Sequence, residues 1–358
     1  MMDSDPWSLE SVARDREVVV CTGPGGVGKT TISAAIALHA ARGGRRACVI
    51  TVDPARRLAD SLGLQSLVNT PTEVEGDWPG HLFALMLDTK GTFDDLVHRY
   101  ARTPEQAEGI LGNRLYQNLA GALSGTQEYM AMEKLYELVD SKAFDLVVVD
   151  TPPTRNALDL LDAPRRLTRF LENRLFRALL LPTRLSLRAI GMATQALLRT
   201  ISKVAGAEIV QDAVAFFQAF EGMEEGFRTR AGAVRELLAD PSTAFVLVTS
   251  ARPDAITEAT YFAEKLVERG MTPAALVVNR IHPTFGSAAD DAPGPATGPL
   301  AALETNLATM RGVAAREEQA YADLAARVAP APIGRIPLFG HDVHELVALQ
   351  RTAEQLFA

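Results

Sequence analysis

The segment GPGGVGKT, residues 23–30, constrains the fold of this chain more than any other stretch. It matches the pattern G-x-x-x-x-G-K-[ST], which holds a phosphate when a strand precedes it and a helix follows it. The apolar run EVVVCT at 17–22 predicts the strand, and TISAAIALHAAR at 31–42 predicts the helix. Glycines let backbone N–H groups close around phosphate oxygens, and the helix N-terminus adds its positive end.

The residues of this loop have distinct expected roles in binding a nucleoside triphosphate and magnesium. Lys29 can reach the β- and γ-phosphates, and the Thr30 hydroxyl can ligate Mg²⁺. We expect nucleotide contacts along the loop and into the first helical turn, at Gly23, Gly25, Gly26, Val27, Gly28, Lys29, Thr30 and Thr31. The alternative is a glycine-rich strand-to-helix turn without a ligand, in which the Lys-Thr pair would be a coincidence.

Further short apolar runs predict more strands, at 47–51, 82–87, 145–150, 244–249, 275–279 and 331–337. Several are apolar nearly throughout, which is typical of strands buried on both faces of a parallel sheet. Helical stretches separate most of them. The alternation predicts an α/β fold with a doubly wound, mostly parallel sheet of about seven or eight strands, as in P-loop NTPases.

Two long stretches break this alternation, because residues 91–140 and 156–235 contain no strand pattern. The segment EYMAMEKLYELVD at 128–140 instead places Met130, Lys134, Leu135 and Leu138 at helical spacing. We therefore expect a helical insertion subdomain at 91–140 and 161–235. The P-loop ATPase core would then comprise residues 1–90, 141–160 and 236–358.

Composition excludes several other classes of protein. The net charge of −8 argues against a specific nucleic-acid partner. The two cysteines, Cys21 and Cys48, are too few for a disulfide framework and form no zinc-binding pair. The N-terminal residues lack the order of a signal peptide, and no apolar run is long enough for a transmembrane helix. We expect a cytoplasmic protein, with membrane association through partners left open.

The run VVVD at 147–150 places Asp150 at the end of a strand. In phosphate-loop enzymes, an aspartate at this position supplies the second protein contact with Mg²⁺. A lone aspartate there can also cap the following helix. Because Thr30 supplies the first metal contact, we assign Thr30 and Asp150 to the metal.

Three motifs in order, GGVGKTT, TVDPARRLAD and VVVDTPPTRNALDLLDAP, resemble those of the ArsA-type ATPase family. This family includes arsenite-pump ATPases and ATPases that target tail-anchored membrane proteins, and the resemblance implies a bacterial member. The resemblance implies ATP and Mg²⁺ as ligands and a dimer as the working form. It also implies that Asp53 positions or activates the attacking water, so Lys29 and Asp53 become the expected catalytic residues. By the same resemblance, Asn279 contacts adenine.

One residue departs from the family at a position that matters for catalysis. The family has a lysine where Pro24 stands, and that lysine reaches across the dimer to the partner's nucleotide. Proline has neither the charge nor a backbone N–H. We therefore expect a heterodimer with a paralogue that keeps this lysine, and a homodimer is the alternative.

The stretch 163–203 carries nine arginine or lysine residues against one acidic residue, together with many leucines. Such a basic, amphipathic stretch predicts a surface for an apolar helix or a membrane-protein client. The simpler interpretation is a packed helix with its arginines in water. We expect ATP hydrolysis that changes the dimer's conformation and couples to such a client. The alternatives are an arsenite-efflux ATPase, a partitioning or positioning ATPase, and an ATP-binding module that does not hydrolyse.

Overall fold

The computed structural model describes residues 8–53, 55–119, 126–152, 161–163, 165–166, 168–169, 212, 215–216, 218–286, 299–340 and 342–358. The chain divides into two compact units. The first comprises residues 1–86, 138–158 and 239–358, and the second comprises residues 87–137 and 159–238. Most of the basic stretch 163–203 lies outside the described residues.

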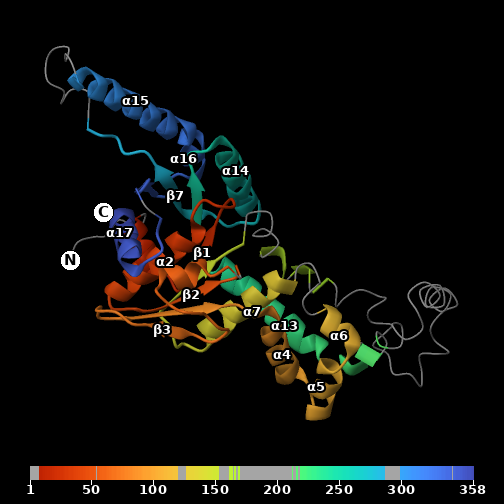
Figure 1. Ribbon diagram of the computed structural model, residues 1–358. Coiled ribbons are helices and arrows are strands. Elements are labelled where there is room, and N and C mark those ends of the chain that lie inside the picture. The colour runs from red at the N-terminus through yellow and green to blue at the C-terminus, as the bar shows by residue number, and fades with distance from the viewer. Residues whose placement is uncertain are drawn as a thin grey trace. The chain divides into compact units, whose positions relative to one another are not determined.

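The first unit is built on an eight-stranded sheet (Figure 1). Its strands, in spatial order, are β3 (Thr72–Val74), β4 (His81–Met86), β2 (Arg46–Thr51), β5 (Leu146–Asp150), β1 (Val18–Thr22), β6 (Thr243–Ser250), β7 (Pro273–Ile281) and β8 (Ile333–Pro337). All neighbours are parallel except β3 and β4. The predicted α/β fold with a mostly parallel sheet is therefore confirmed.

The seven predicted strands correspond to β1, β2 and β4 to β8, whereas β3 was not predicted. This strand has the three residues TEV, and it pairs antiparallel at the sheet edge. A run of three residues is too short to show an alternating pattern. The apolar strands β1 and β5 are buried along their whole length, because helices cover both faces of the sheet.

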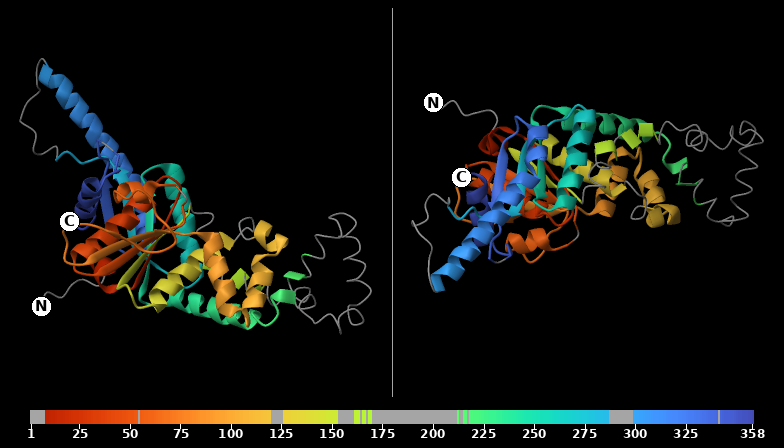
Figure 2. Two further views of the ribbon diagram at one scale, coloured as in Figure 1. Left: turned by 60° about the horizontal axis from the view of Figure 1, so that its bottom comes forward. Right: turned by 90° about the horizontal axis from the view of Figure 1, so that it is seen from above.

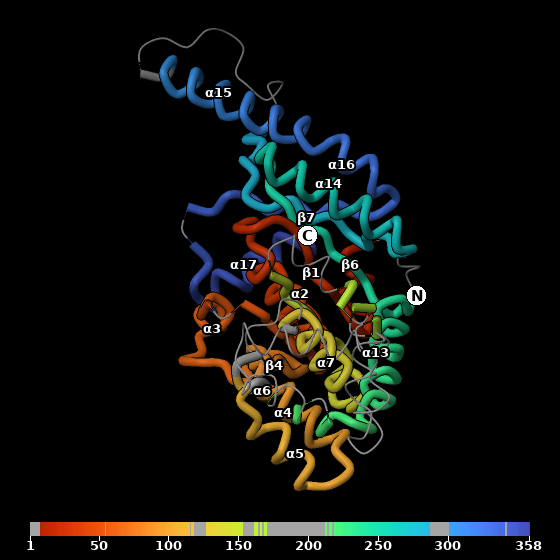
Figure 3. The backbone as a smooth tube through the Cα atoms, turned by 90° about the vertical axis from the view of Figure 1, so that its right-hand side faces the viewer, coloured from red at the N-terminus to blue at the C-terminus, as the bar shows by residue number. Residues whose placement is uncertain are grey.

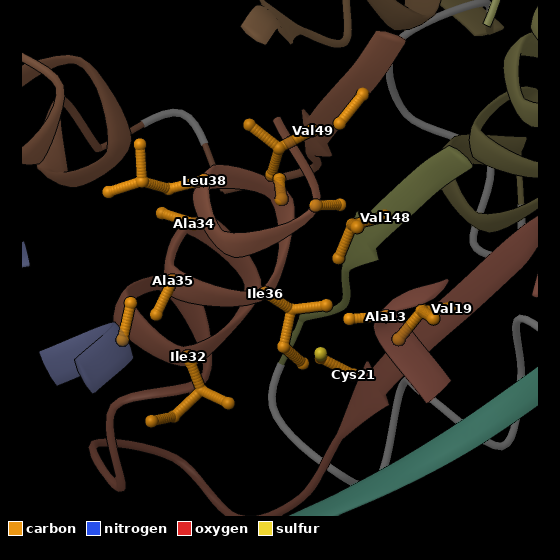
Figure 4. Close-up of a cluster of buried hydrophobic side chains, with 14 of the residues drawn as sticks. Ala13, Val19, Cys21, Ile32, Ala34, Ala35, Ile36, Leu38, Val49 and Val148 are labelled. Carbon is orange, nitrogen blue, oxygen red and sulfur yellow. The ribbon is translucent and has the colours of Figure 1, made fainter. Parts of the chain in front are cut away.

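Helix α2 (Lys29–Arg42) forms the centre of the main hydrophobic core. Figure 4 shows Ile36 of this helix pointing toward Val19 and Cys21 of β1 and Val148 of β5. These side chains share one face of the sheet because alternate residues of a strand point the same way. Burial of this face fixes α2, and with it the loop at its N-terminus.

Other helices of the first unit complete the two layers. Helices α1 (Leu9–Asp15) and α17 (Leu346–Leu356) pack against α2, and the short α3 (Arg57–Ser61) lies beside both α2 and α17. On the opposite face, α14 (Pro253–Glu268) packs on β6 and α16 (Ala322–Val328) packs on β7. Helix α16 contacts α14 and α15 (Pro299–Ala320), and these three helices lie together in Figure 3. Figure 2 shows α15 extending away from the sheet.

The second unit is helical in its described residues. Its elements are α4 (Thr89–Tyr100), α5 (Pro104–Leu111), α6 (Arg114–Leu119), most of α7 (Thr126–Asp140) and α13 (Glu224–Ala239). The helix predicted at 128–140 is confirmed as α7, with Met130 and Leu135 buried. Arg230 of α13 donates from Nε to Glu133 Oε2 of α7 at 2.8 Å, and both side chains are largely buried. This ion pair joins α7 to α13 inside the unit.

Candidate functional site

The loop from Gly23 to Gly28 connects the end of β1 to the start of α2. Its first and last glycines hold backbone conformations that other residues rarely adopt. Gly23 has a φ of +152°, and a Cβ there would lie 1.9 Å from the carbonyl oxygen of Val248. Gly28 has a φ of +95°, and a Cβ there would lie 2.2 Å from Nδ2 of Asn279. Glycine is therefore required at both ends of the loop.

Lys29 begins α2 and lies over the loop that precedes it. The residue is only 7% exposed, and its Nζ donates a hydrogen bond to the carbonyl oxygen of Pro24 at 2.9 Å. Burial lowers the pKa of the Lys29 ammonium, although Asp150 and Asp53 nearby act in the opposite direction. The N-terminus of α2 has Gly28 as its cap and no side-chain capping bond. An ammonium and uncapped helical N–H groups at one point can together bind phosphate oxygens.

Asp150, the last residue of β5, lies beside the start of α2. Its Oδ2 accepts hydrogen bonds from the Thr30 hydroxyl at 2.7 Å and from the Thr51 hydroxyl at 2.9 Å. Its Oδ1 is buried and has no hydrogen-bond partner among the described residues. Burial raises the pKa of Asp150 to about 6, although the two hydroxyl donors act to lower it. A buried carboxylate oxygen without a donor is costly, and a hard cation such as Mg²⁺ would satisfy it.

Sheet register explains why these groups meet. Cys21 of β1, Asp150 of β5 and Thr51 of β2 are direct partners across three adjacent parallel strands. The carboxyl ends of parallel strands lie at one edge of the sheet, where ligands bind in open α/β folds. The Thr151 hydroxyl also donates to the carbonyl oxygen of Cys21 at 2.8 Å, which ties the end of β5 to β1.

Asp53 follows β2 by two residues and is partly exposed, with 35% of its side chain accessible. Its Oδ1 accepts a hydrogen bond from the backbone N–H of Ala55 at 2.9 Å, and its Oδ2 lies 3.9 Å from NH1 of Arg57. Its own N–H donates to the Thr51 hydroxyl at 3.2 Å. One carboxylate oxygen of Asp53 therefore binds the backbone two residues further on, and the other faces the guanidinium of Arg57. Its role with water stays a prediction.

Asn279, near the end of β7, is tied to the phosphate loop. Its Nδ2 donates to the carbonyl oxygen of Val27 at 2.8 Å, and its Oδ1 accepts from the backbone N–H of Arg280. The amide thus binds the loop directly, and it lies so close to Gly28 that a side chain there would clash with it. Contact with adenine stays a prediction, whereas support of the loop is a role that sequence reasoning missed.

One pocket of the first unit collects most of the predicted site residues. Its lining includes Gly26, Gly28, Lys29, Thr30, Thr31, Asp53, Asp150 and Asn279. Gly23, Gly25 and Val27 do not line this pocket, although Val27 and Gly25 line a second pocket. The first pocket is also lined by the end of β8 and the chain that follows it, at Ile336 to Phe339 and Asp342 to His344.

Two residues that sequence reasoning missed belong to this site, namely Thr51 and Arg280. Thr51 bridges Asp150 and Asp53, and Arg280 lines both pockets. A polar residue directly at the end of a buried strand was the available signal for Thr51, as it was for Asp150. Arg280 follows a predicted strand by one residue and gave no comparable signal.

Comparison with known proteins identifies the family. The family model described as Anion-transporting ATPase matches residues 16–290 of the 358 in this chain. The chain belongs to the anion-transporting ATPase family. The resemblance stated from the three motifs is thereby confirmed, and the loop, Lys29 and Asp150 all fall within the matched residues.

Relatives of this anion-transporting ATPase family member carry ATPase names. ATPase asna-1 of Caenorhabditis elegans is 32% identical over 175 residues, covering 46% of this chain and 50% of that protein. ATPase GET3 of Malassezia globosa is 31% identical over 174 residues, covering 47% of this chain and 50% of that protein. The chain thus spans about half the length of these ATPase relatives. These names support the expected enzyme class.

A longer match is to an uncharacterised protein of Streptomyces coelicolor, 33% identical over 300 residues. It covers 82% of this chain and 69% of that protein, so the likeness to this relative extends beyond the phosphate loop and its neighbouring strands. Within the described part of the chain, no helix has the length and apolar character needed to cross a membrane.

Proposed function

We propose that this chain is a Mg²⁺-dependent ATPase that binds ATP in the pocket above the phosphate loop. The observation that carries the proposal is the arrangement of Asp150. One of its oxygens accepts hydrogen bonds from the Thr30 and Thr51 hydroxyls, and the other is buried without a partner among the described residues. The ATPase names of its relatives support the same chemistry. We also propose that the chain has two functional parts, the P-loop ATPase core and the helical insertion subdomain.

Each proposed role follows from the position of the side chain. Lys29, whose Nζ lies at the loop, binds the β- and γ-phosphates together with the backbone N–H groups of the loop. Thr30 and Asp150 would hold Mg²⁺, which would neutralise charge on those phosphates. Asp53 lines the same pocket and orients the attacking water with its carboxylate. Asn279 fixes the loop and lines the pocket, and it is proposed also to contact adenine.

Two substitutions test this assignment separately. Lys29→Ala removes the main cation of the loop and should abolish ATP binding, measured by titration calorimetry with Mg²⁺ present. Asp53→Asn keeps the size of the side chain and should leave ATP binding unchanged while phosphate release falls at least tenfold. Arg252→Ala, on an exposed arginine paired with Asp254, is the matched control. ATP binding by Lys29→Ala at wild-type affinity would remove the proposal.

Pro24 supports a finer proposal about assembly. The carbonyl oxygen of Pro24 accepts a hydrogen bond from Lys29, and the proline side chain carries no charge. We propose that the working form is a dimer in which a related subunit provides the missing cation to this chain's ATP. The isolated chain should then bind ATP and hydrolyse it slowly, and a lysine-bearing paralogue should accelerate hydrolysis. Fast hydrolysis by the chain alone would contradict the heterodimer.

The client proposal rests on the basic, leucine-rich stretch 163–203. An apolar helix or a membrane protein would bind there, and ATP would change its access. Hydrogen exchange over 163–220 with and without Mg²⁺ and ATP tests the coupling. Equal protection in both conditions would contradict it.

The arsenite alternative requires thiols that converge. Cys21 and Cys48 are fully buried, in β1 and β2, and β5 lies between those two strands. Adjacent strands are about 4.8 Å apart, so the two thiols are separated by two such spacings. The two cysteines are also offset along the strands. On β5, Cys48 pairs with Val147, whereas Cys21 pairs with Asp150. These two thiols cannot hold one arsenite ion together.

A further inference from the structure

The backbone at Arg280 is unusual in two respects. Its φ is +60°, in the left-handed region that few residues other than glycine adopt. It also lies where the pairing of β7 with β8 shifts register, between Asn279 and Ile281. An extra residue at such a shift redirects its side chain, and bulges of this kind occur often beside active sites. The chain therefore keeps a strained conformation at the residue that follows the loop-binding asparagine.

The side chain of Arg280 turns toward the phosphate loop. Its NH1 lies 3.4 Å from the carbonyl oxygen of Gly26, a long hydrogen bond. Consecutive residues of β7 thus hold consecutive carbonyl groups of the loop, since Asn279 binds Val27 and Arg280 binds Gly26. Arg280 and Gly26 line both the nucleotide pocket and the second pocket, so the guanidinium lies at the rim between them.

The charge balance of the nucleotide pocket makes this guanidinium significant. Lys29, the proposed phosphate ligand of the loop, and Arg57 also line the pocket, but Arg57 lies 3.9 Å from Asp53. Arg280 has no carboxylate partner among the residues that the structure describes, and nearby Glu317 is bound by His282. The loop residue Pro24, which lines the second pocket together with Arg280, supplies no cation.

We propose that Arg280 binds the phosphates of ATP from within the same chain, and this rests on the proposed ATP site. When ATP occupies the pocket, the guanidinium leaves the Gly26 carbonyl group and donates to phosphate oxygens. Charge-assisted bonds from arginine to phosphate are shorter and stronger than a 3.4 Å bond to a neutral carbonyl group. The strained backbone keeps the side chain aimed at the rim, so only side-chain rotation is needed.

Four variants test the proposal by titration calorimetry with ATP and Mg²⁺. Arg280→Ala should weaken ATP binding about 10- to 100-fold, because a charged hydrogen bond of this size is lost. Arg280→Gly removes the charge but suits the left-handed backbone, so it should weaken ATP binding equally without lowering the melting temperature. Arg280→Lys keeps a cation and should weaken binding less. Arg252→Ala, an arginine that lines only the second pocket, should bind ATP within about twofold of wild type.

The glycine variant separates a phosphate contact from a purely structural role. If Arg280→Gly bound ATP as tightly as the wild type, the residue would matter only for its backbone and the inference would be overturned. The Lys29→Ala variant tests the underlying site. Loss of ATP binding in Lys29→Ala with normal binding in Arg280→Ala would overturn this inference alone, whereas normal binding in Lys29→Ala would overturn the proposed ATP site.

Discussion

Replacing Thr51 with valine tests whether the Asp150 carboxylate depends on its hydroxyl donors. Thr51 is buried, with 1% exposed, and its hydroxyl donates to Asp150 and accepts from the N–H of Asp53. Valine has nearly the same shape but lacks the hydroxyl, so the variant loses both bonds without opening a cavity. Within the described part of the chain, Asp150 would keep only the Thr30 donor, since its other oxygen already has no partner there.

The expected cost is large for a single hydroxyl group. Leaving a buried polar group without a partner costs about 1–3 kcal/mol, and the cost is higher for a charged group. We therefore expect Thr51→Val to lower the free energy of unfolding by about 2–3 kcal/mol. Urea unfolding followed by circular dichroism, without nucleotide and at neutral pH, measures this change.

The matched control is Thr51→Ser, which keeps the hydroxyl and removes one methyl group. Loss of that buried methyl should cost about 1 kcal/mol. The valine variant should therefore be the less stable of the two. If the serine variant were less stable than the valine variant, packing of the methyl group would dominate and the argument about Asp150 would be wrong.

Two further predictions concern other parts of the fold. Gly28→Ala should destabilise the protein more than Gly44→Ala in thermal unfolding. Both glycines have left-handed backbones, with φ of +95° and +91°, but of these two only Gly28 would place a Cβ in contact, at 2.2 Å from the Asn279 amide. Equal drops in melting temperature for the two variants would show that this contact is unimportant. Arg230→Ala should cost about 3–5 kcal/mol, because it leaves Glu133 buried and unpaired, as urea unfolding would show. Arg235→Ala on the exposed side of α13 should cost little, and similar losses in both variants would argue against the buried pair.

The sequence by itself determined the phosphate loop, every strand except β3 and the two candidate metal contacts. Each of these depends on a local pattern. The loop needs glycines at fixed positions, and the strands β1 and β5 show as uninterrupted apolar runs because both of their faces are buried. Asp150 was found because a charged residue directly after such a run must lie at the edge of the sheet.

Only the tertiary structure decided which of these residues meet, and what else joins them. Thr51 and Asp150 are 99 residues apart, and Val27 and Asn279 are 252 apart. Thr51 and Asp150 touch because the sheet order places β5 next to β2 in a register that aligns these two residues with Cys21 of β1. Strand order and register arise from packing of the whole core, which no short segment encodes. The strained backbone of Arg280 likewise exists only because β7 is held between β6 and β8 and shifts register against β8.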